Sequence, residues 1–203
     1  MKKTYLFHTI LFHTIVFPTI VLFVWLLSAA GCSRYQLKIP SPPLRGADLY
    51  PQEQEKNGLI VAADDYFDED KSRQAFGINF PQKNILVVEV VISNRSNDTY
   101  TVQSNEVLLL KGDRIIYPLL PSEVSSDEQI NEFLNILELR DIVVNPGETG
   151  HGFLYFRLPE EPEEERNAYF SSHVPHGDYR LRVGATQIEN SSRLIYTVYL
   201  RKL

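Results

Sequence analysis

The order of apolar and polar residues divides the chain into three parts. Residues 6–27 form a nearly continuous apolar run, residues 33–56 are polar and rich in proline, and the chain from Gly58 onward is dominated by short alternating patterns. Alternation with a period of two is typical of β-strands, because successive side chains point to opposite faces of a sheet. We therefore expect an N-terminal helical segment, an extended connection and a β-rich domain.

The clearest predicted strand covers residues 85–93. Its apolar side chains share one face, whereas Glu89 and Ser93 lie on the other face. Further short strands are predicted at residues 59–63, 99–103, 106–111, 115–117, 142–144, 153–158, 179–183 and 194–201. Seven to nine short strands separated by turn residues favour a mainly β fold, an antiparallel sandwich of two sheets.

One α-helix is predicted within this series of strands. Residues 130, 133, 134 and 137 are apolar and fall on one helical face. Ser126 is the predicted N-cap, with Gln129 three residues later as in a capping box. We expect this helix to cover a sheet edge or an open end of the sandwich, and we expect the charged segment 64–73 to form a loop or a helical turn.

The end of the apolar run carries the most informative residue of the chain, its single cysteine. Lys2 and Lys3 precede the run, and the sequence Leu-Ser-Ala-Ala-Gly-Cys ends at Cys32. This order of basic, apolar and small residues is that of an export signal. The ending resembles the lipobox of bacterial prolipoproteins, which implies cleavage between Gly31 and Cys32 and a diacylglyceryl group on the Cys32 thiol. A signal peptide at 1–31 follows, although Ala29 stands where a lipobox more often has leucine.

An uncleaved signal anchor is the alternative, because about 22 apolar residues suffice to span a bilayer as a helix. In both cases Lys2 and Lys3 stay cytoplasmic, so the domain is tethered to a membrane with the same orientation. Residues 32–57 then form a tether, because proline-rich chain is extended. Alternatively, part of this segment, residues 35–39, packs on the domain as an edge strand. The sandwich is predicted at 58–203.

A turn and the strand after it carry a second resemblance. Asn145-Pro146-Gly147-Glu148 has the residues of a type II turn and leads into an apolar strand at 152–156. Together with the strand and asparagine at 90–94, it resembles the immunoglobulin-like domains of uncharacterised bacterial lipoproteins. This resemblance implies an immunoglobulin-like sandwich and an interaction module of the cell envelope.

Composition excludes several kinds of site. Removing residues 1–31 takes away two of the 20 basic residues and none of the 26 acidic ones, which leaves a net charge of −8. So acidic a chain is a poor ligand for nucleic acid. With Cys32 assigned to lipid, the domain has no disulfide, no cysteine nucleophile and no thiolate metal site.

Three polar segments are candidate sites. Two histidines and a carboxylate (His173, His176 and Asp178) are suitable zinc ligands, and the acidic run 64–70 is suitable for calcium, but neither has the spacing of a known site. Glutamates at 160–165 predict a solvated loop that could contact a basic partner. We predict no catalytic residue, no metal site and no cofactor.

The predicted protein is therefore a non-enzymatic lipoprotein that binds an envelope protein or polymer. Ser33 follows the cysteine, and a serine at this position resembles that of lipoproteins sorted to the outer membrane. This indicates an outer-membrane anchor facing the periplasm. An inner-membrane signal anchor and a Gram-positive cell surface remain the alternatives. Exposed sheet edges suggest binding by strand addition. A small-molecule- or metal-binding accessory lipoprotein is the second hypothesis, and a hydrolase the third.

Overall fold

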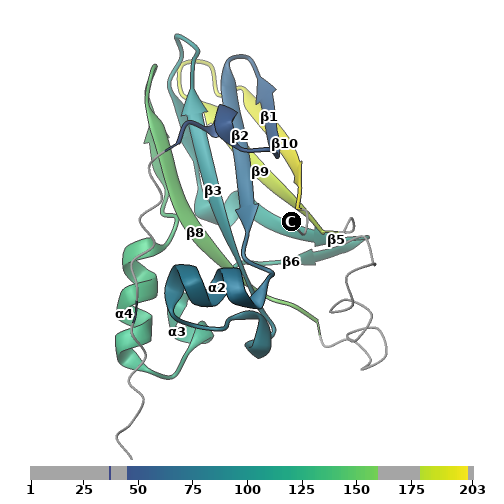
Figure 1. Cartoon of the computed structure of the whole chain (residues 1–203). Coiled ribbons are helices and arrows are strands. Elements are labelled where there is room, and N and C mark those ends of the chain that lie inside the picture. The colour runs from purple at the N-terminus through teal and green to yellow at the C-terminus, as the bar shows by residue number, and fades with distance from the viewer. Residues whose placement is uncertain (1–36, 38–44, 160–178, 201–203) are drawn as a thin grey trace, which may run out of the picture. The chain divides into compact units, whose positions relative to one another are not determined.

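Two antiparallel sheets lie at the centre of the molecule (Figure 1). The computed structural model describes residue 37, residues 45–159 and residues 179–200, all within one compact unit. The predicted signal segment, Gly31, Cys32 and Ser33 lie outside the described residues. Sheet 1 has the strand order β1-β2-β3-β8, made by β1 (Glu53–Lys56), β2 (Leu59–Asp65), β3 (Ile85–Asn94) and β8 (Thr149–Arg157).

Sheet 2 has six strands in the described part of the chain. Its order is β6-β5-β9-β4-β7, and β10 pairs with the other edge of β9. The strands are β4 (Tyr100–Val102), β5 (Val107–Lys111), β6 (Arg114–Ile116), β7 (Ile142–Val144), β9 (Tyr179–Gln187) and β10 (Arg193–Tyr199). All strand pairs are antiparallel, as the short turn-linked strands of the sequence predict.

The main core fills the space between the sheets. Side chains from β2, β3 and β8 meet side chains from β4, β5, β9 and β10, and they are almost fully buried. The alternation of β3 and β10 is therefore explained, because every second residue of each strand enters this core. The immunoglobulin-like class predicted from the sequence, a mainly β antiparallel sandwich, is confirmed.

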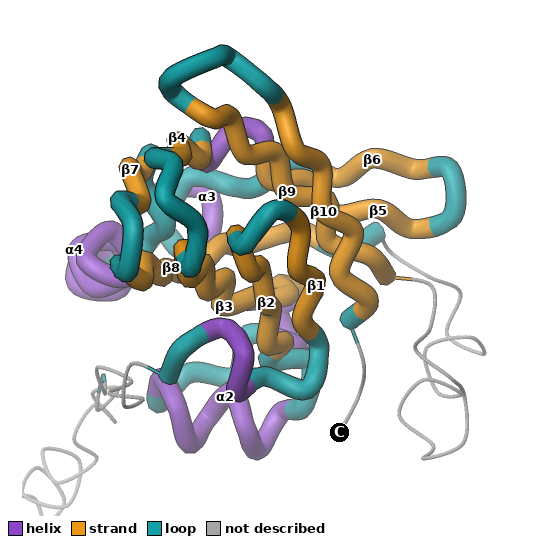
Figure 2. Tube along the Cα trace, turned by 90° about the horizontal axis from the view of Figure 1, so that it is seen from above, coloured by secondary structure: helices purple, strands orange, loops and turns teal. Residues whose placement is uncertain are grey.

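Helices cover the outer face of sheet 1. They are α2 (Glu69–Phe76), α3 (Pro121–Val124) and α4 (Glu128–Leu137), and they form a second core with the outward side chains of β3 and β8. Figure 2 shows α2 and α4 on the sheet-1 side of the sandwich. A third, smaller apolar cluster lies under the 3-10 helix η1 (Ala47–Leu49), and two further 3-10 turns are η2 (Pro81–Lys83) and η3 (Ser104–Glu106).

The predicted helix corresponds to α4, but its N-cap is one residue later than expected. Asp127 accepts hydrogen bonds from the backbone N–H groups of Gln129 and Ile130, so it caps the helix in place of Ser126. The apolar face packs on β8, where the Tyr155 hydroxyl donates to the Leu134 carbonyl at 3.2 Å. The structure adds α2 and α3 to the single helix expected, and α2 includes the end of the charged segment 64–73.

The folded part begins before residue 58. Residues 45–56, which the sequence places in the tether, lie on sheet 1 as η1 and β1. Both are too short and too polar for periodicity to reveal them. Pairing of β1 with β2 fixes them, because Lys56 and Leu59 flank a tight turn with Asn57 and Gly58 at positive φ.

The Asn145–Glu148 turn has the predicted form. Gly147 has a φ of +81°, as position i+2 of a type II turn requires, and the Glu148 N–H donates to the Asn145 carbonyl. The buried Asn94 on β3 holds this turn, because its side-chain amide donates to the carbonyls of Val144 at 2.9 Å and Asp98 at 2.7 Å.

Across the described residues, none of the helices is long and apolar enough to cross a membrane.

Candidate functional site

The outer face of sheet 2 is the broad surface available for binding. The apolar clusters of the described residues lie between the sheets or on the outer face of sheet 1. Apart from the Glu106 side chain of η3, which lies over Gly184 on β9 and pairs with Arg193, no described element lies on the outer face of β5, β9 and β10. In Figure 2 this face lies on the side of the sandwich away from α2.

Strand register aligns the side chains of this face in rows. One row crosses four strands, because Leu110 on β5 pairs with Ile115 on β6 and with Arg180 on β9, and Arg180 pairs with Tyr199 on β10. Cross-strand partners point to the same face. The next row contains Leu108, Arg182 and Thr197, and Ile195 follows on β10. We call these eight residues the sheet-2 face.

The sheet-2 face combines apolar and cationic groups. Ile115, Ile195 and Tyr199 are 49%, 38% and 55% exposed, so large apolar side chains are open to solvent. Arg180 and Arg182 stand in the middle of the face, and Arg180 also donates to the Gly112 carbonyl at 3.1 Å. Arginine and tyrosine beside aliphatic groups are the composition that protein interfaces favour. The face is cationic although the whole chain has a net charge of −6.

Two of the sheet edges are covered, which restricts the predicted binding by strand addition. The edge of β8 that faces away from β3 is covered by two backbone hydrogen bonds. The Leu119 N–H donates to the Tyr155 carbonyl at 2.7 Å, and the Leu139 N–H donates to the Phe153 carbonyl at 2.9 Å. At the edge of β10, Gln54 accepts from the Thr197 N–H and Lys56 donates to the Ile195 carbonyl. Backbone groups bonded in this way are not available to an added strand.

A second unusual feature, a buried polar cluster, lies on the outer face of sheet 1. Glu89 is 2% exposed and sits on β3 between Val87, which belongs to the helix-covered core, and Val91, which belongs to the cluster under η1. The hydroxyls of Tyr50 and Tyr66 donate hydrogen bonds to its carboxyl group. His151 on β8 places Nδ1 3.6 Å from Glu89 Oε1.

Burial and a neighbouring acid change the protonation of this cluster. The pKa of Glu89 is raised to about 7, chiefly because burial penalises the charged form and also because Asp64 lies beside it. Lys71 and the two tyrosine hydroxyls oppose this rise without cancelling it. Burial and Glu89 raise the pKa of Tyr50 to about 12, and that of Tyr66 is raised as well, so both hydroxyls stay protonated donors.

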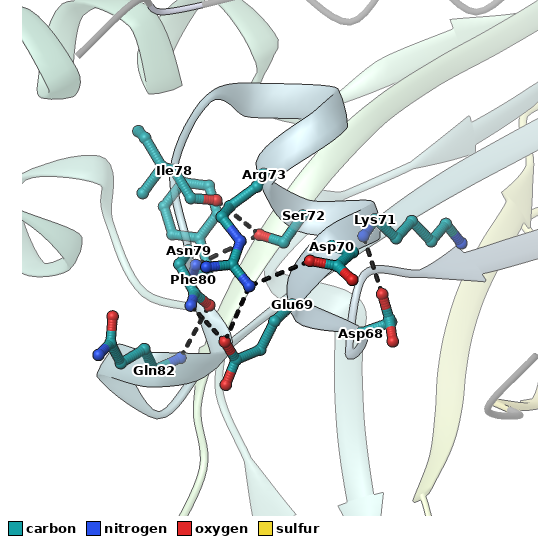
Figure 3. A network of polar contacts seen from close by, with 10 residues as sticks. All are labelled: Asp68, Glu69, Asp70, Lys71, Ser72, Arg73, Ile78, Asn79, Phe80 and Gln82. Carbon is teal, nitrogen blue, oxygen red and sulfur yellow. Dashed lines mark hydrogen bonds and ion pairs between the residues drawn. The ribbon is translucent and has the colours of Figure 1, made fainter. Parts of the chain in front are cut away.

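Helix α2 places Lys71 against the cluster, and Figure 3 shows what fixes the helix. Asp68 caps its first turn by accepting from the Lys71 N–H at 2.9 Å. The Ser72 hydroxyl donates to the Ile78 carbonyl and accepts from the Phe80 N–H, which ties the helix to the chain that follows. Lys71 Nζ then lies 2.6 Å from Asp64 Oδ1 and over the Tyr66 ring.

The structure does not assemble a metal site from the candidate ligands that it describes. His173, His176, Asp178 and the glutamates at 160–165 lie outside the described residues. The acidic run 64–70 has other roles: Asp64 pairs with Lys71, Asp68 caps α2, and Glu69 and Asp70 pair with Arg73. Within the described ranges, no three His, Cys, Asp or Glu residues are grouped so that they could hold a metal ion.

Sequence reasoning missed both surfaces described above. It placed Glu89 on the second face of its strand, but it did not indicate that this face is buried. A single glutamate does not by itself predict burial. The feature that could have indicated it is the position of this carboxylate within the long apolar run 85–92. The sheet-2 face was missed because its members come from four strands whose pairing the sequence does not state.

The geometry defines a small β-sandwich with one helix-covered face and one open face. The chain belongs to the family described as a domain of unknown function (DUF4352), whose model matches residues 52–177. No curated protein matches the chain in sequence.

The solved structures that match this chain are distant in sequence. The yjhA protein from Bacillus subtilis is 13% identical, with a TM-score of 0.46 over 74% of this chain and 97% of that one. A candidate lipoprotein from the same organism, ycdA, is 13% identical with a TM-score of 0.38; the match covers 72% of this chain and 38% of that one. A functionally unknown protein from Listeria monocytogenes is 11% identical with a TM-score of 0.38, over 72% and 79%.

Proposed function

We propose that this chain is a lipid-anchored envelope protein that binds an acidic protein partner through the sheet-2 face and catalyses no reaction. The observation that carries the binding role is the row Ile115–Leu110–Arg180–Tyr199, which is ordered by strand pairing and open to solvent. An ordered, rigid row of this kind loses little conformational entropy on binding.

An acidic partner fits the charge of the face. Arg180 and Arg182 are two residues apart on the outer face of β9 and lie among aliphatic side chains, where a carboxylate partner would be partly desolvated. Guanidinium groups bind carboxylates with two parallel hydrogen bonds, and opposite charges on the two partners speed their encounter. A broad, flat sheet face suits a folded partner better than a small ligand, which needs a concave site.

The anchor is proposed from the sequence. Cys32 with its preceding small residues resembles a lipobox, and Ser33 resembles outer-membrane cargo, so the proposed location is the outer membrane facing the periplasm. An inner-membrane signal anchor or a Gram-positive cell surface would present the same domain on the same side of a membrane. The residues between Cys32 and Leu37, which packs against the helix-covered core, would link the lipid to the sandwich.

Crosslinking in native membranes tests the binding role. A photoreactive phenylalanine analogue is placed at Tyr199 and, as control, at Ile136, which is 72% exposed on α4 on the other side of the sandwich. We expect one discrete crosslinked protein from position 199 and none from position 136. Arg180→Glu combined with Arg182→Glu should lower the yield about tenfold, the effect of 1.4 kcal/mol, whereas Arg140→Glu should leave it unchanged. Equal yields from both positions would refute the proposed face.

Intact mass tests the anchor independently. Protein purified from native membranes should begin at Cys32 and carry acyl mass, and the Cys32→Ala variant should lose that mass. A full-length chain without acyl groups would instead make residues 6–27 a membrane anchor and remove the basis for the outer-membrane location.

A further inference from the structure

The segment Arg45–Tyr50, which we call the strap, is held on the outer face of sheet 1 by few contacts. Ala47 is fully buried against Ile60, Ala62 and Val91, and its N–H donates to the Ser93 hydroxyl at 2.8 Å. Asp48 forms an ion pair with Arg95, but both side chains are partly exposed. The third attachment is Tyr50, which hydrogen-bonds to Glu89. Figure 1 shows η1 of the strap lying over β2 and β3.

Of the two buried charged side chains among the described residues, Asp65 and Glu89, the strap contacts Glu89. The groups that face it come from every element packed around it: Tyr50 and, through Tyr50, Arg45 from the strap, Asp64 from β2, Tyr66 from the connection to α2, Lys71 from α2, and His151 from β8. Lys71 is already engaged by Asp64 and by the Asp65 carbonyl, both at 2.6 Å from Nζ.

We propose that Glu89 is a proton-controlled latch, which keeps the strap packed on sheet 1 while its carboxyl group is protonated and lets the strap open more often when it is ionised. An ionised carboxylate at this position faces Asp64 across the strand pair without access to water. Water can reach it if one of its covers moves.

The strap is the cover that moves at the smallest loss of contacts. Tyr66, the other cover, belongs to the helix-covered core, where its ring packs edge-on against Phe76 at 4.9 Å and under the Lys71 ammonium at 4.5 Å. Displacing Tyr66 would disrupt that core, whereas opening the strap uncovers only the small third cluster of Ala47, Ile60, Ala62 and Val91 with the partly buried Tyr50. The raised pKa of Glu89 places the change between pH 4.5 and about 7.

Amide hydrogen exchange of the full mature chain tests the latch without reference to a partner or a membrane. The peptide covering residues 45–52 is followed at pH 5, 6, 7 and 8, with rates corrected for the intrinsic effect of pH. We expect its protection to fall about tenfold per pH unit between pH 5 and 7 and to level off above pH 7, because opening is coupled to one deprotonation only between the ordinary carboxyl pKa of 4.5 and the pKa of about 7 in the packed fold. The peptide covering α4 is the internal reference and should not change.

Variants decide which group is responsible. Glu89→Gln keeps the shape and the acceptor oxygen but cannot ionise, so it should remove the pH dependence of the strap. His151→Gln should retain it. Tyr50→Phe should reduce strap protection at every pH by removing the hydrogen bond while leaving the fold intact. An unchanged pH dependence in Glu89→Gln, a flat profile in the wild-type protein, or loss of the dependence in His151→Gln alone would overturn the proposal.

Discussion

Asp64 on β2 lies directly opposite Glu89 on β3 in the antiparallel register. Like charges at opposed positions destabilise a strand pair. The protein reduces this repulsion in two ways: Lys71 pairs with Asp64 at 2.6 Å, and the raised pKa of Glu89 keeps that carboxyl largely protonated below pH 7. The relationship links helix α2, sheet 1 and the strap through one buried side chain.

The first prediction concerns the pH dependence of stability. The pKa of Glu89 is about 7 in the folded protein and has the ordinary value of 4.5 in the unfolded chain. Between these pH values the folded state therefore holds a proton that the unfolded chain has released. The free energy of unfolding therefore falls as pH rises from 4.5 to 7. A shift of this size corresponds to roughly 3 kcal/mol.

Urea unfolding of the wild-type protein and Glu89→Gln between pH 4 and 8 checks this. Because the two proteins share every other titrating group, the difference between their unfolding free energies isolates Glu89. The free energy of unfolding of Glu89→Gln should increase relative to that of the wild type as pH rises from 4.5 to 7. A difference that is constant across this range would contradict the prediction.

The second prediction concerns the buried Asn94. Asn94→Ala removes four hydrogen bonds, two donated to the Val144 and Asp98 carbonyls and two accepted from the N–H and hydroxyl of Ser96, and it leaves the buried acceptor at Val144 without its partner. We expect a loss of about 2–4 kcal/mol, because an unsatisfied buried group carries its desolvation penalty. Asn105→Ala, at an exposed position in η3, is the matched control and should stay within about 0.5 kcal/mol of the wild type in the same urea experiment.

The third prediction concerns the contact that closes the β8 edge. A Cβ atom at Gly152 would lie 2.5 Å from Leu139 Cα and 2.7 Å from Leu139 N, so Gly152→Ala must displace backbone and break the Leu139–Phe153 hydrogen bond. Gly112→Ala meets no atom within 4 Å and suffers only the strain of its positive φ, about 1 kcal/mol. We expect thermal unfolding to show a clearly lower Tm for Gly152→Ala than for Gly112→Ala; equal values would argue against close packing at this edge.

The fourth prediction separates two possible caps of α4. Asp127 accepts two backbone hydrogen bonds at the helix start, so Asp127→Ala should destabilise the protein by about 1 kcal/mol. Ser126→Ala should be nearly neutral. Urea unfolding of both variants checks the assignment, and the reverse order of their effects would restore the cap that the sequence favours.

Local patterns determined the fold class of this protein. Alternating apolar residues in β3 and β10 place one face of each strand in a core, and this holds in any sandwich because the side-chain period of a strand is two. The helical spacing at 130–137 identified α4, and the Pro-Gly pair identified the turn at 145–148. Each of these signals acts between residues close in sequence, so no partner is needed to recognise it.

Tertiary structure decided what covers each face and which strands become neighbours. Glu89 and Ile115 are both sheet residues next to apolar segments, yet Glu89 is buried under Tyr50 and Tyr66, whereas Ile115 is half exposed. The difference arises because three helices and the strap return to sheet 1, and no described element returns to the sheet-2 face. Pairing over long sequence distances depends on the summed packing of the whole domain, and no local window of sequence contains that information.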